Sequence, residues 1–93
     1  MNKGELVTVV ATKTGLTKKD TELVLTTILE TIVEVISSGE KLTLVGFGSF
    51  EARNRKEKEG RNPNTGEKIY IPASRVPVFS VGKFFKKRVN SQS

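Results

Sequence analysis

Basic side chains surround one proline in the stretch GRNPNTG, residues 60–66. The lysines and arginines of this part of the chain are Arg53, Arg55, Lys56, Lys58, Arg61 and Lys68. Lys and Arg bind phosphates through charge and hydrogen bonds, so a dense group of them indicates a polyanionic partner. The proline adds a rigid apolar ring that has no N–H group. These residue types at this spacing predict binding of an anionic polymer.

The positive charge of the protein lies in its C-terminal half. Residues 1–45 contain five basic and six acidic side chains, whereas residues 46–93 contain eleven basic and four acidic ones. The net charge of +6 therefore arises entirely from residues 46–93. A basic half of this kind favours a nucleic-acid partner. The alternative is a solvated basic surface that only maintains solubility.

The sequence lacks the residue types on which most enzyme sites depend. It contains no His and no Cys, and GFGSFE, residues 46–51, is neither a Walker loop nor a dinucleotide fingerprint. We therefore predict no enzymatic activity, no metal and no cofactor. No apolar run reaches the roughly 18 residues of a membrane span, and the N-terminus has no signal-peptide pattern. Binding of the basic C-terminal segment to a membrane surface is a separate alternative.

The chain length bounds the size of the core. The 93 residues suffice for one domain, and an extended arm would leave about 70 residues for the core. A core of that size usually needs a disulfide, a metal or a partner chain, and the first two require residue types that are absent here. Dimerisation is therefore expected. The absence of Cys fits the reducing cytoplasm.

The N-terminal half has the apolar spacing of two helices. Asn2 and Glu5 have capping-box spacing, which predicts a first helix that ends near Gly15. Its apolar residues at i, i+3 and i+4 are Leu6, Val9 and Val10. Thr17 is a candidate N-cap of the second helix, which Gly39 would end together with the two serines before it.

The second helix is apolar on more than one side. One stripe consists of Leu25, Ile28, Leu29, Ile32 and Ile36, and the residues that widen it are Val24, Val33 and Val35. A stripe of this width predicts packing against the first helix and against a second subunit. The alternative is that these valines are simply exposed.

After Gly39 the apolar period changes to two, which predicts strands. The expected strands are KLTLV at residues 41–45, FEARNRKEKE at 50–59, EKIYI at 67–71 and RVPVF at 75–79, with GFGS at 46–49 as a tight connection. Phe47, Phe50 and Phe79 are expected in the core. Ser80 is a candidate cap of a short C-terminal helix whose inward residues would be Phe84, Phe85 and Val89.

Residues 53–75 are expected to form a two-stranded arm with little apolar surface. The ten strand steps from Arg53 to Pro63 would span about 33 Å at ~3.3 Å per residue, close to the ~34 Å of one turn of duplex DNA. An isolated hairpin is marginally stable, so such an arm needs a ligand. Pro63 has two interpretations: an ordinary turn proline, or an apolar wedge that enters between base pairs.

The segment GFGSFEARNRKEKEGRNPNTG, residues 46–66, resembles the signature of the HU/IHF family of bacterial architectural DNA-binding proteins. The similarity extends from MNKGEL at the N-terminus through TLVGFGSF and GRNP to FSVGKFFK at residues 79–86. It implies an α+β fold and an intertwined homodimer. The implied parts are a helical dimerisation part at 1–39, a three-stranded antiparallel sheet with a C-terminal helix at 40–52 and 76–90, and a DNA-binding β-arm at 53–75.

The resemblance also implies roles for single residues. Pro63 would intercalate into the minor groove and kink the duplex, the mechanism for which HU and IHF are the standard examples. The residues implied near sugar and phosphate are Arg55, Lys58, Arg61 and Asn62. The other DNA-binding candidates of the arm are its remaining basic side chains, Arg53, Lys56, Lys68 and Arg75. Those implied over the body of the protein are Lys3, Lys83 and Lys86. Gly46, Gly48 and Ser49 are similar to a phosphate clamp of the family, although a hairpin that needs positive φ explains the glycines equally well.

Glu57 and Glu59 depart from what a DNA-binding arm needs. Strand alternation places them on one face with Arg53, Arg55 and Arg61, and places Lys56 and Lys58 on the other. Two carboxylates near phosphates would weaken binding unless cations pair with them. The register of the hairpin, and therefore their partners, does not follow from the sequence.

Three further alternatives remain open at this point. The protein could bend double-stranded DNA with little sequence specificity, could be one chain of a site-specific IHF-like heterodimer, or could bind structured RNA. Minor-groove readout separates A·T from G·C and little more, which favours low specificity. The expected location is the cytoplasm, in a bacterial nucleoid or a plastid nucleoid.

Overall fold

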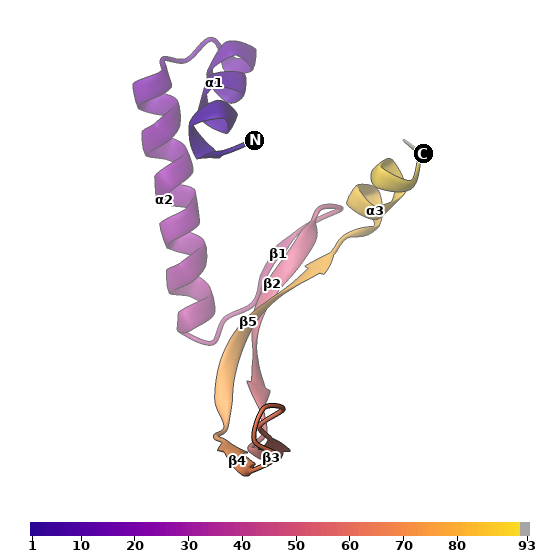
Figure 1. The fold of residues 1–93 in the computed structure, drawn as a ribbon. Helices are drawn as coiled ribbons and strands as arrows, with labels where there is room; N and C mark the ends of the chain where they lie inside the picture. Colours follow the sequence, from indigo (N-terminus) through magenta and orange to yellow (C-terminus); the bar gives the residue numbers. More distant parts are fainter. Residues whose placement is uncertain (92–93) are drawn as a thin grey trace. The chain divides into compact units, whose positions relative to one another are not determined.

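The computed structural model describes residues 1–91 and has the α+β class that the sequence predicts (Figure 1). Its elements follow the order α1 (Lys3–Thr14), α2 (Lys18–Ser37), β1 (Leu42–Leu44), β2 (Gly48–Arg55), β3 (Lys58–Arg61), β4 (Lys68–Ile71), β5 (Ser74–Val81) and α3 (Lys83–Asn90). The chain divides into two compact units, residues 1–34 and residues 35 onward. Each unit is described by itself.

Helix α1 begins and ends where the sequence predicts. The Asn2 side chain accepts a hydrogen bond from the Glu5 amide at 2.9 Å, and Gly15 closes the helix with φ 75°. The buried side chains of α1 are those of Val7 and Ala11. Leu6, whose spacing helped to predict the helix, is 39% exposed. The buried face of α1 is therefore narrower than its apolar face, and part of its apolar surface stays exposed.

Helix α2 is capped by Thr17, whose hydroxyl oxygen accepts the Asp20 amide at 3.1 Å. The helix ends at Ser37 and is followed by Gly39 at φ 95°, as predicted. Its wide apolar surface is largely uncovered in the single chain, since Leu23 is 66% exposed and Val33 is 64% exposed. Exposed apolar surface of this extent is typical of a helix that packs on another protein chain.

The second unit contains a three-stranded antiparallel sheet in the order β1-β2-β5. The turn between β1 and β2 is closed by a hydrogen bond of 2.9 Å from the Phe47 amide to the Leu44 carbonyl, with Gly46 at φ 81°. A positive φ at the third residue of a tight turn is the requirement of a type II turn, which glycine meets without strain. A hairpin is present as predicted, but its connection is residues 45–47 and not 46–49, because Gly48 and Ser49 already pair with Leu44 and Thr43 in the sheet.

The arm extends from this sheet as a second, two-stranded ladder of β3 and β4. Figure 1 shows this ladder at one end of the β2–β5 ribbon and α3 at the other. The uninterrupted strand that the sequence predicted from residue 50 to 59 is wrong, because pairing stops after Arg55↔Ser74 and resumes at Lys58↔Ile71. Two residues separate these pairs on each strand, so the register continues unchanged and places Glu57 opposite Pro72. Pro72 has no N–H to donate, which explains the break.

Helix α3 begins two residues later than the sequence suggested. Ser80 lies in β5 and pairs with Ser49, and the N-cap is Gly82, which has no side chain to accept a hydrogen bond. The predicted Ser80 cap is therefore wrong, because the strand continues through Val81. The Gly46 carbonyl accepts the Phe85 amide at 3.2 Å instead. Backbone from the distant β1–β2 turn thus replaces a capping side chain.

An aromatic cluster joins α3 to the sheet. Phe47 lies 5.6 Å from Phe79 and 5.2 Å from Phe85, and Phe50 lies 4.8 Å from Phe79, all between ring centroids. These separations are typical of stabilising aromatic pairs. Phe47, Phe50 and Phe79 therefore pack against one another, but they are not a buried core in the single chain, where Phe47 is 45% and Phe79 is 40% exposed. The expected inward face of α3 holds for Phe85 only, because Phe84 is 70% exposed in the single chain.

Candidate nucleic-acid interface

Exposed basic side chains line the arm from its base to its tip. Arg53 and Arg55 lie at the end of β2, Lys56 lies in the break, and Lys58 and Arg61 lie on β3. Lys68 on β4 pairs with Arg61, Arg75 on β5 pairs with Asn54, and all of these basic side chains are exposed. The arm therefore presents a continuous series of cations to solvent.

The outer ladder has two chemically different faces. Cross-strand partners share a face, so Arg61 with Lys68 and Glu59 with Tyr70 lie on one side. On the other side Ile69 and Ile71 close over Gly60, where an added Cβ would lie 3.6 Å from each of them. The sequence had suggested an arm with little apolar surface. The alternation of apolar residues in EKIYI, residues 67–71, could have predicted this apolar strip.

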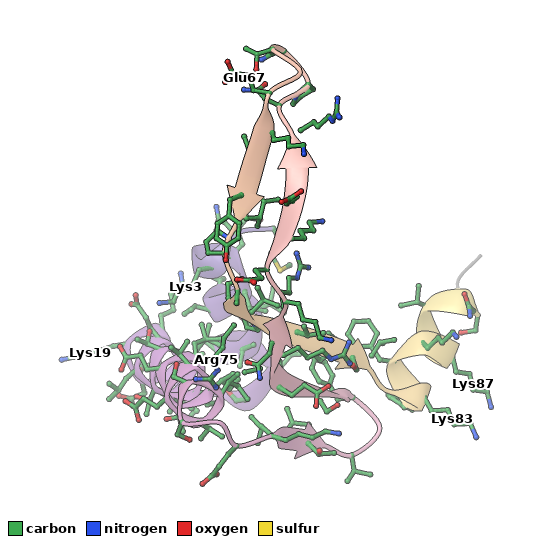
Figure 2. The ribbon with its side chains drawn as sticks, turned by 90° about the horizontal axis from the view of Figure 1, so that it is seen from below. Lys3, Lys19, Glu67, Arg75, Lys83 and Lys87 are labelled. Atoms are coloured by element: carbon green, nitrogen blue, oxygen red, sulfur yellow. The ribbon has the colours of Figure 1, made fainter. Side chains whose placement is uncertain are left out.

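The tip, residues 62–67, exposes Pro63 between the two strands. Asn62 donates its backbone N–H to the Glu67 carbonyl at 2.8 Å and accepts the Gly66 amide at 2.7 Å. The Asn62 side-chain oxygen accepts the Asn64 amide at 2.9 Å. Figure 2 shows Glu67 at the far end of the arm, and Lys83 and Lys87 on α3 at the other end of the same unit.

Two arm cations have partners within the protein. The Arg53 guanidinium binds the Glu51 carboxylate at 2.9 Å. The Arg75 guanidinium donates to the Ser37 carbonyl at 3.5 Å, at the C-terminal end of α2. A cation at this position is favoured by the partial negative charge of the helix end. Arg75 and Arg55 also line a shallow depression at the base of the arm together with Asn54, Ala73 and Ser74.

Glu57 has a neutral partner rather than a cation. The Tyr70 hydroxyl donates a hydrogen bond to the Glu57 carboxylate across the break in the arm. This bond raises the pKa of the Tyr70 phenol above its ordinary value of 10.0, because removing its proton would leave two negative charges in contact. The phenol therefore stays protonated and uncharged at neutral pH. Its hydrogen bond adds no positive charge beside the Glu57 carboxylate.

The glycines of the β1–β2 turn are required by packing. A Cβ at Gly48 would lie 2.5 Å from the Phe79 ring and 2.7 Å from the Ser80 carbonyl oxygen. Gly46 has the positive φ of the turn, and Ser49 pairs in the sheet with Thr43 and Ser80. The hairpin explanation of these glycines is therefore sufficient. A phosphate clamp at Gly46, Gly48 and Ser49 stays a prediction.

The remaining predicted residues lie on helices. Lys3 is the first residue of α1, and its ammonium donates to the Thr26 hydroxyl of α2 at 2.8 Å within the first unit. Lys83 and Lys86 lie on α3 and are exposed. Lys3 and the pair on α3 belong to different units.

Neither a metal site nor a membrane-spanning helix is present in residues 1–91. No group of three or more Asp or Glu residues in this range could hold a metal ion. Within the same range, no helix combines the length and the apolar character that crossing a bilayer requires.

Residues 1–90 match the family model described as bacterial DNA-binding protein. The chain belongs to this family. The match covers both helices of the first unit, the sheet, the arm and α3, so the bacterial DNA-binding protein family accounts for the whole fold. The family is not a family of enzymes. The resemblance to HU that the sequence suggested is confirmed.

Several relatives of this family member are named DNA-binding protein HU. The protein from Nostoc sp. is 64% identical over 89 residues, covering 96% of this chain and 95% of the relative. The protein from Clostridium pasteurianum is 57% identical over 90 residues, covering 97% of this chain and 99% of the relative. These relatives match in length as well as in sequence.

Solved structures show the same fold. A chain of an Anabaena HU–DNA cocrystal structure matches with a TM-score of 0.90 at 64% identity, covering 96% of this chain and 97% of that chain. HU from Thermotoga maritima matches with a TM-score of 0.69 at 43% identity, covering 96% of this chain and 98% of that chain.

Proposed function

We propose that the protein is an architectural double-stranded DNA-binding protein that bends and compacts DNA with little sequence specificity. The observation that carries this proposal is an exposed proline at the apex of a basic arm, in a chain whose relatives are named DNA-binding protein HU. The similar Anabaena chain comes from a structure described as an HU–DNA cocrystal. Two arms of a homodimer would hold the minor groove of the duplex.

Electrostatic attraction supplies most of the binding free energy in this proposal. The cations proposed to contact the DNA backbone are Arg53, Arg55, Lys56, Lys58, Arg61, Lys68 and Arg75 on the arm, and Lys3, Lys83 and Lys86 on the helices. Each phosphate that such a cation neutralises releases condensed counterions, and this release favours binding on any sequence. The turn at Gly46, Gly48 and Ser49 would add backbone N–H groups that point at a phosphate.

Pro63 would act as the wedge that bends the duplex. It is exposed, apolar and without an N–H group that insertion would desolvate. Separating two stacked base pairs costs a few kcal/mol, which contacts along a wrapped arm can offset. Duplexes that are already flexible, nicked or kinked cost less to deform, so we expect the protein to prefer them.

The homodimer is supported by apolar surface that the single chain leaves uncovered. On α2, Leu23, Val24 and Val33 are between 53% and 66% exposed, and on α3 Phe84 is 70% exposed. A patch of this kind marks a protein contact, and a second copy of the same chain is the simplest partner. A homodimer would carry two arms and two prolines, and it would work on DNA of the bacterial nucleoid.

An Arg61→Ala variant tests the electrostatic part of the proposal. Arg61 is exposed next to the tip, so its loss should weaken binding on all duplexes and lower the slope of log Kd against log salt by about one unit per arm. Gel-shift titrations over a salt series, with linear duplex, nicked duplex and duplex RNA, would measure both quantities.

Lys13→Ala is the matched control for Arg61→Ala. Lys13 also carries one positive charge, in the last turn of α1, and belongs to no proposed contact. Its substitution should leave the salt slope unchanged. Equal slopes for the parent and Arg61→Ala would reject the contact at Arg61, and equal affinity for duplex RNA and nicked DNA would reject a preference for DNA.

The carboxylates of the arm should oppose DNA binding. Glu57→Gln combined with Glu59→Gln removes two negative charges, while the new amide oxygen at position 57 can still accept the Tyr70 hydroxyl. We expect tighter binding at low salt, with the difference shrinking as salt rises because exposed charges are screened. Fluorescence anisotropy with labelled duplex at two salt concentrations measures this. Unchanged or weaker affinity would show that these carboxylates do not face the DNA.

A further inference from the structure

One residue makes three of the hydrogen bonds that hold the arm tip. Asn62 contributes its N–H to Glu67, its carbonyl to Gly66 and its side-chain oxygen to Asn64, at 2.8, 2.7 and 2.9 Å. Asn62 is partly buried, whereas Pro63 and Asn64 are exposed. The backbone N–H, the backbone carbonyl and the side-chain oxygen of Asn62 are therefore all hydrogen-bonded within the protein.

The hydrogen bond from the Asn64 amide to the Asn62 side-chain oxygen closes a turn that contains Pro63. An Asn oxygen that accepts the amide two residues later forms an Asx turn, which mimics one turn of backbone around the residue between them. The ring of Pro63 already fixes its own φ near −65°. The bond to Asn64 restrains the rotation that remains, which is the ψ of Pro63. Gly66 at φ 73° then returns the chain to β4.

This geometry matters because a wedge works only when it is held in place. An apolar ring on a freely moving loop would lose conformational entropy on insertion, and that loss would reduce the affinity for bent DNA. A loop that already has the bound conformation avoids most of this loss. The tip needs such support from within, since an isolated two-stranded ladder is only marginally ordered.

We propose that Asn62 is a positioning residue, whose side-chain oxygen orders Pro63 at the apex of the arm before DNA arrives. The inference rests on the proposed function and adds to it how the wedge is presented. In this role Asn62 influences the bending of DNA through Pro63, while Arg61 next to it contacts phosphate.

Three variants separate this role from direct contact with DNA. Asn62→Ala removes the acceptor. Asn62→Asp keeps an oxygen at the same place and adds a charge. Asn64→Ala is the matched control, because Asn64 takes part in the turn only through its backbone N–H, which alanine retains.

The first measurement uses the free protein without DNA. Hydrogen exchange at the residue-64 amide, followed by NMR as a protection factor, should accelerate about threefold to tenfold in Asn62→Ala, the range expected for one net hydrogen bond. Asn62→Asp and Asn64→Ala should stay within about twofold of the parent. If Asn62 only contacted DNA directly, Asn62→Ala would leave the protection factor of the residue-64 amide unchanged, because no DNA is present in this measurement. Unchanged protection in Asn62→Ala would overturn the proposal.

The second measurement is the bend of a nicked duplex at saturating protein, from energy transfer between dyes on its ends. Asn62→Ala should bend less than the parent, whereas Asn64→Ala should match it. Asn62→Asp should need more protein at low salt but reach the bend of the parent at saturation. A parent-like bend in Asn62→Ala would overturn the inference alone. A parent protein that leaves the duplex straight would overturn the proposed function and the inference with it.

Discussion

A Pro63→Ala variant is expected to bind duplex DNA and to bend it far less than the parent protein. The substitution removes no charge, so the affinity should stay within about tenfold, since phosphate contacts dominate it. A methyl group is too small to hold base pairs apart. Inserted wedges of this type kink DNA by about 20–90° each, and most of that angle should be lost. Energy transfer between the ends of a short duplex, measured at saturation, gives the bend.

Pro63→Leu is the control for the chemistry of the wedge. Leucine is apolar and large enough to enter between base pairs but lacks the fixed φ of proline. It should retain much of the bending that alanine loses. If Pro63→Ala bent DNA as sharply as the parent, Pro63 would be an ordinary turn proline, and the bend would have to come from wrapping alone.

A Gly82→Ala variant is expected to lose about 3 kcal/mol of stability, at the upper end of the cost of overfilling a packed site. A Cβ at this position would lie 2.5 Å from the Gly46 carbonyl oxygen and 2.6 Å from the Phe47 carbonyl carbon. Both atoms are backbone, so no side chain can rotate away. Relief would require moving the turn and breaking the hydrogen bond of 2.7 Å from the Gly82 amide to the Phe47 carbonyl.

Urea unfolding followed by circular dichroism measures this loss. Gly4→Ala is the control, because the nearest atom to its added Cβ would be the Asn2 side-chain oxygen at 3.5 Å, an ordinary contact. Alanine is favoured over glycine inside a helix by up to about 1 kcal/mol, so Gly4→Ala should stabilise the protein. A loss below about 1 kcal/mol in Gly82→Ala would mean that the turn and α3 separate easily.

The local features of the fold could be predicted because their causes lie within a few residues. Asn2 and Thr17 cap helices through amides three residues away, and Gly15 ends α1 immediately after its last turn. The hairpin turn at Gly46 likewise depends on its own φ. Composition and spacing capture such effects directly, as they captured the cluster of cations around Pro63.

Features that depend on distant residues were missed. Ser80 is a good capping residue by type, yet β5 continues through it because Ser80 pairs with Ser49. The amide that an N-cap side chain would satisfy is bonded by Gly46, a residue of another turn. The break at Pro72 was readable, since proline rarely lies inside a ladder. The partner of Glu57 could not be predicted from the sequence, because it depends on the register of the hairpin.

The candidate site was predictable in residue types but not in surroundings. Strand alternation correctly placed Glu59 and Arg61 on one face, and the register adds Tyr70 and Lys68 to it. The sequence could not show that Arg53 binds Glu51 or that Arg75 reaches the end of α2. These intramolecular contacts would compete with phosphate for two of the proposed cations.

The unchanged register on both sides of the Pro72 break has a consequence for how arm length can evolve. The inner ladder is joined to the aromatic cluster, whereas the outer ladder pairs only with itself. Adding two cross-strand pairs to the outer ladder would move the apex about 6.6 Å outward, would keep each side chain on its face, and would repack no phenylalanine. In the proposed homodimer, the separation of the two proposed kinks along a duplex is therefore a quantity that insertions of matched residues could tune, leaving the core and its stability as they are.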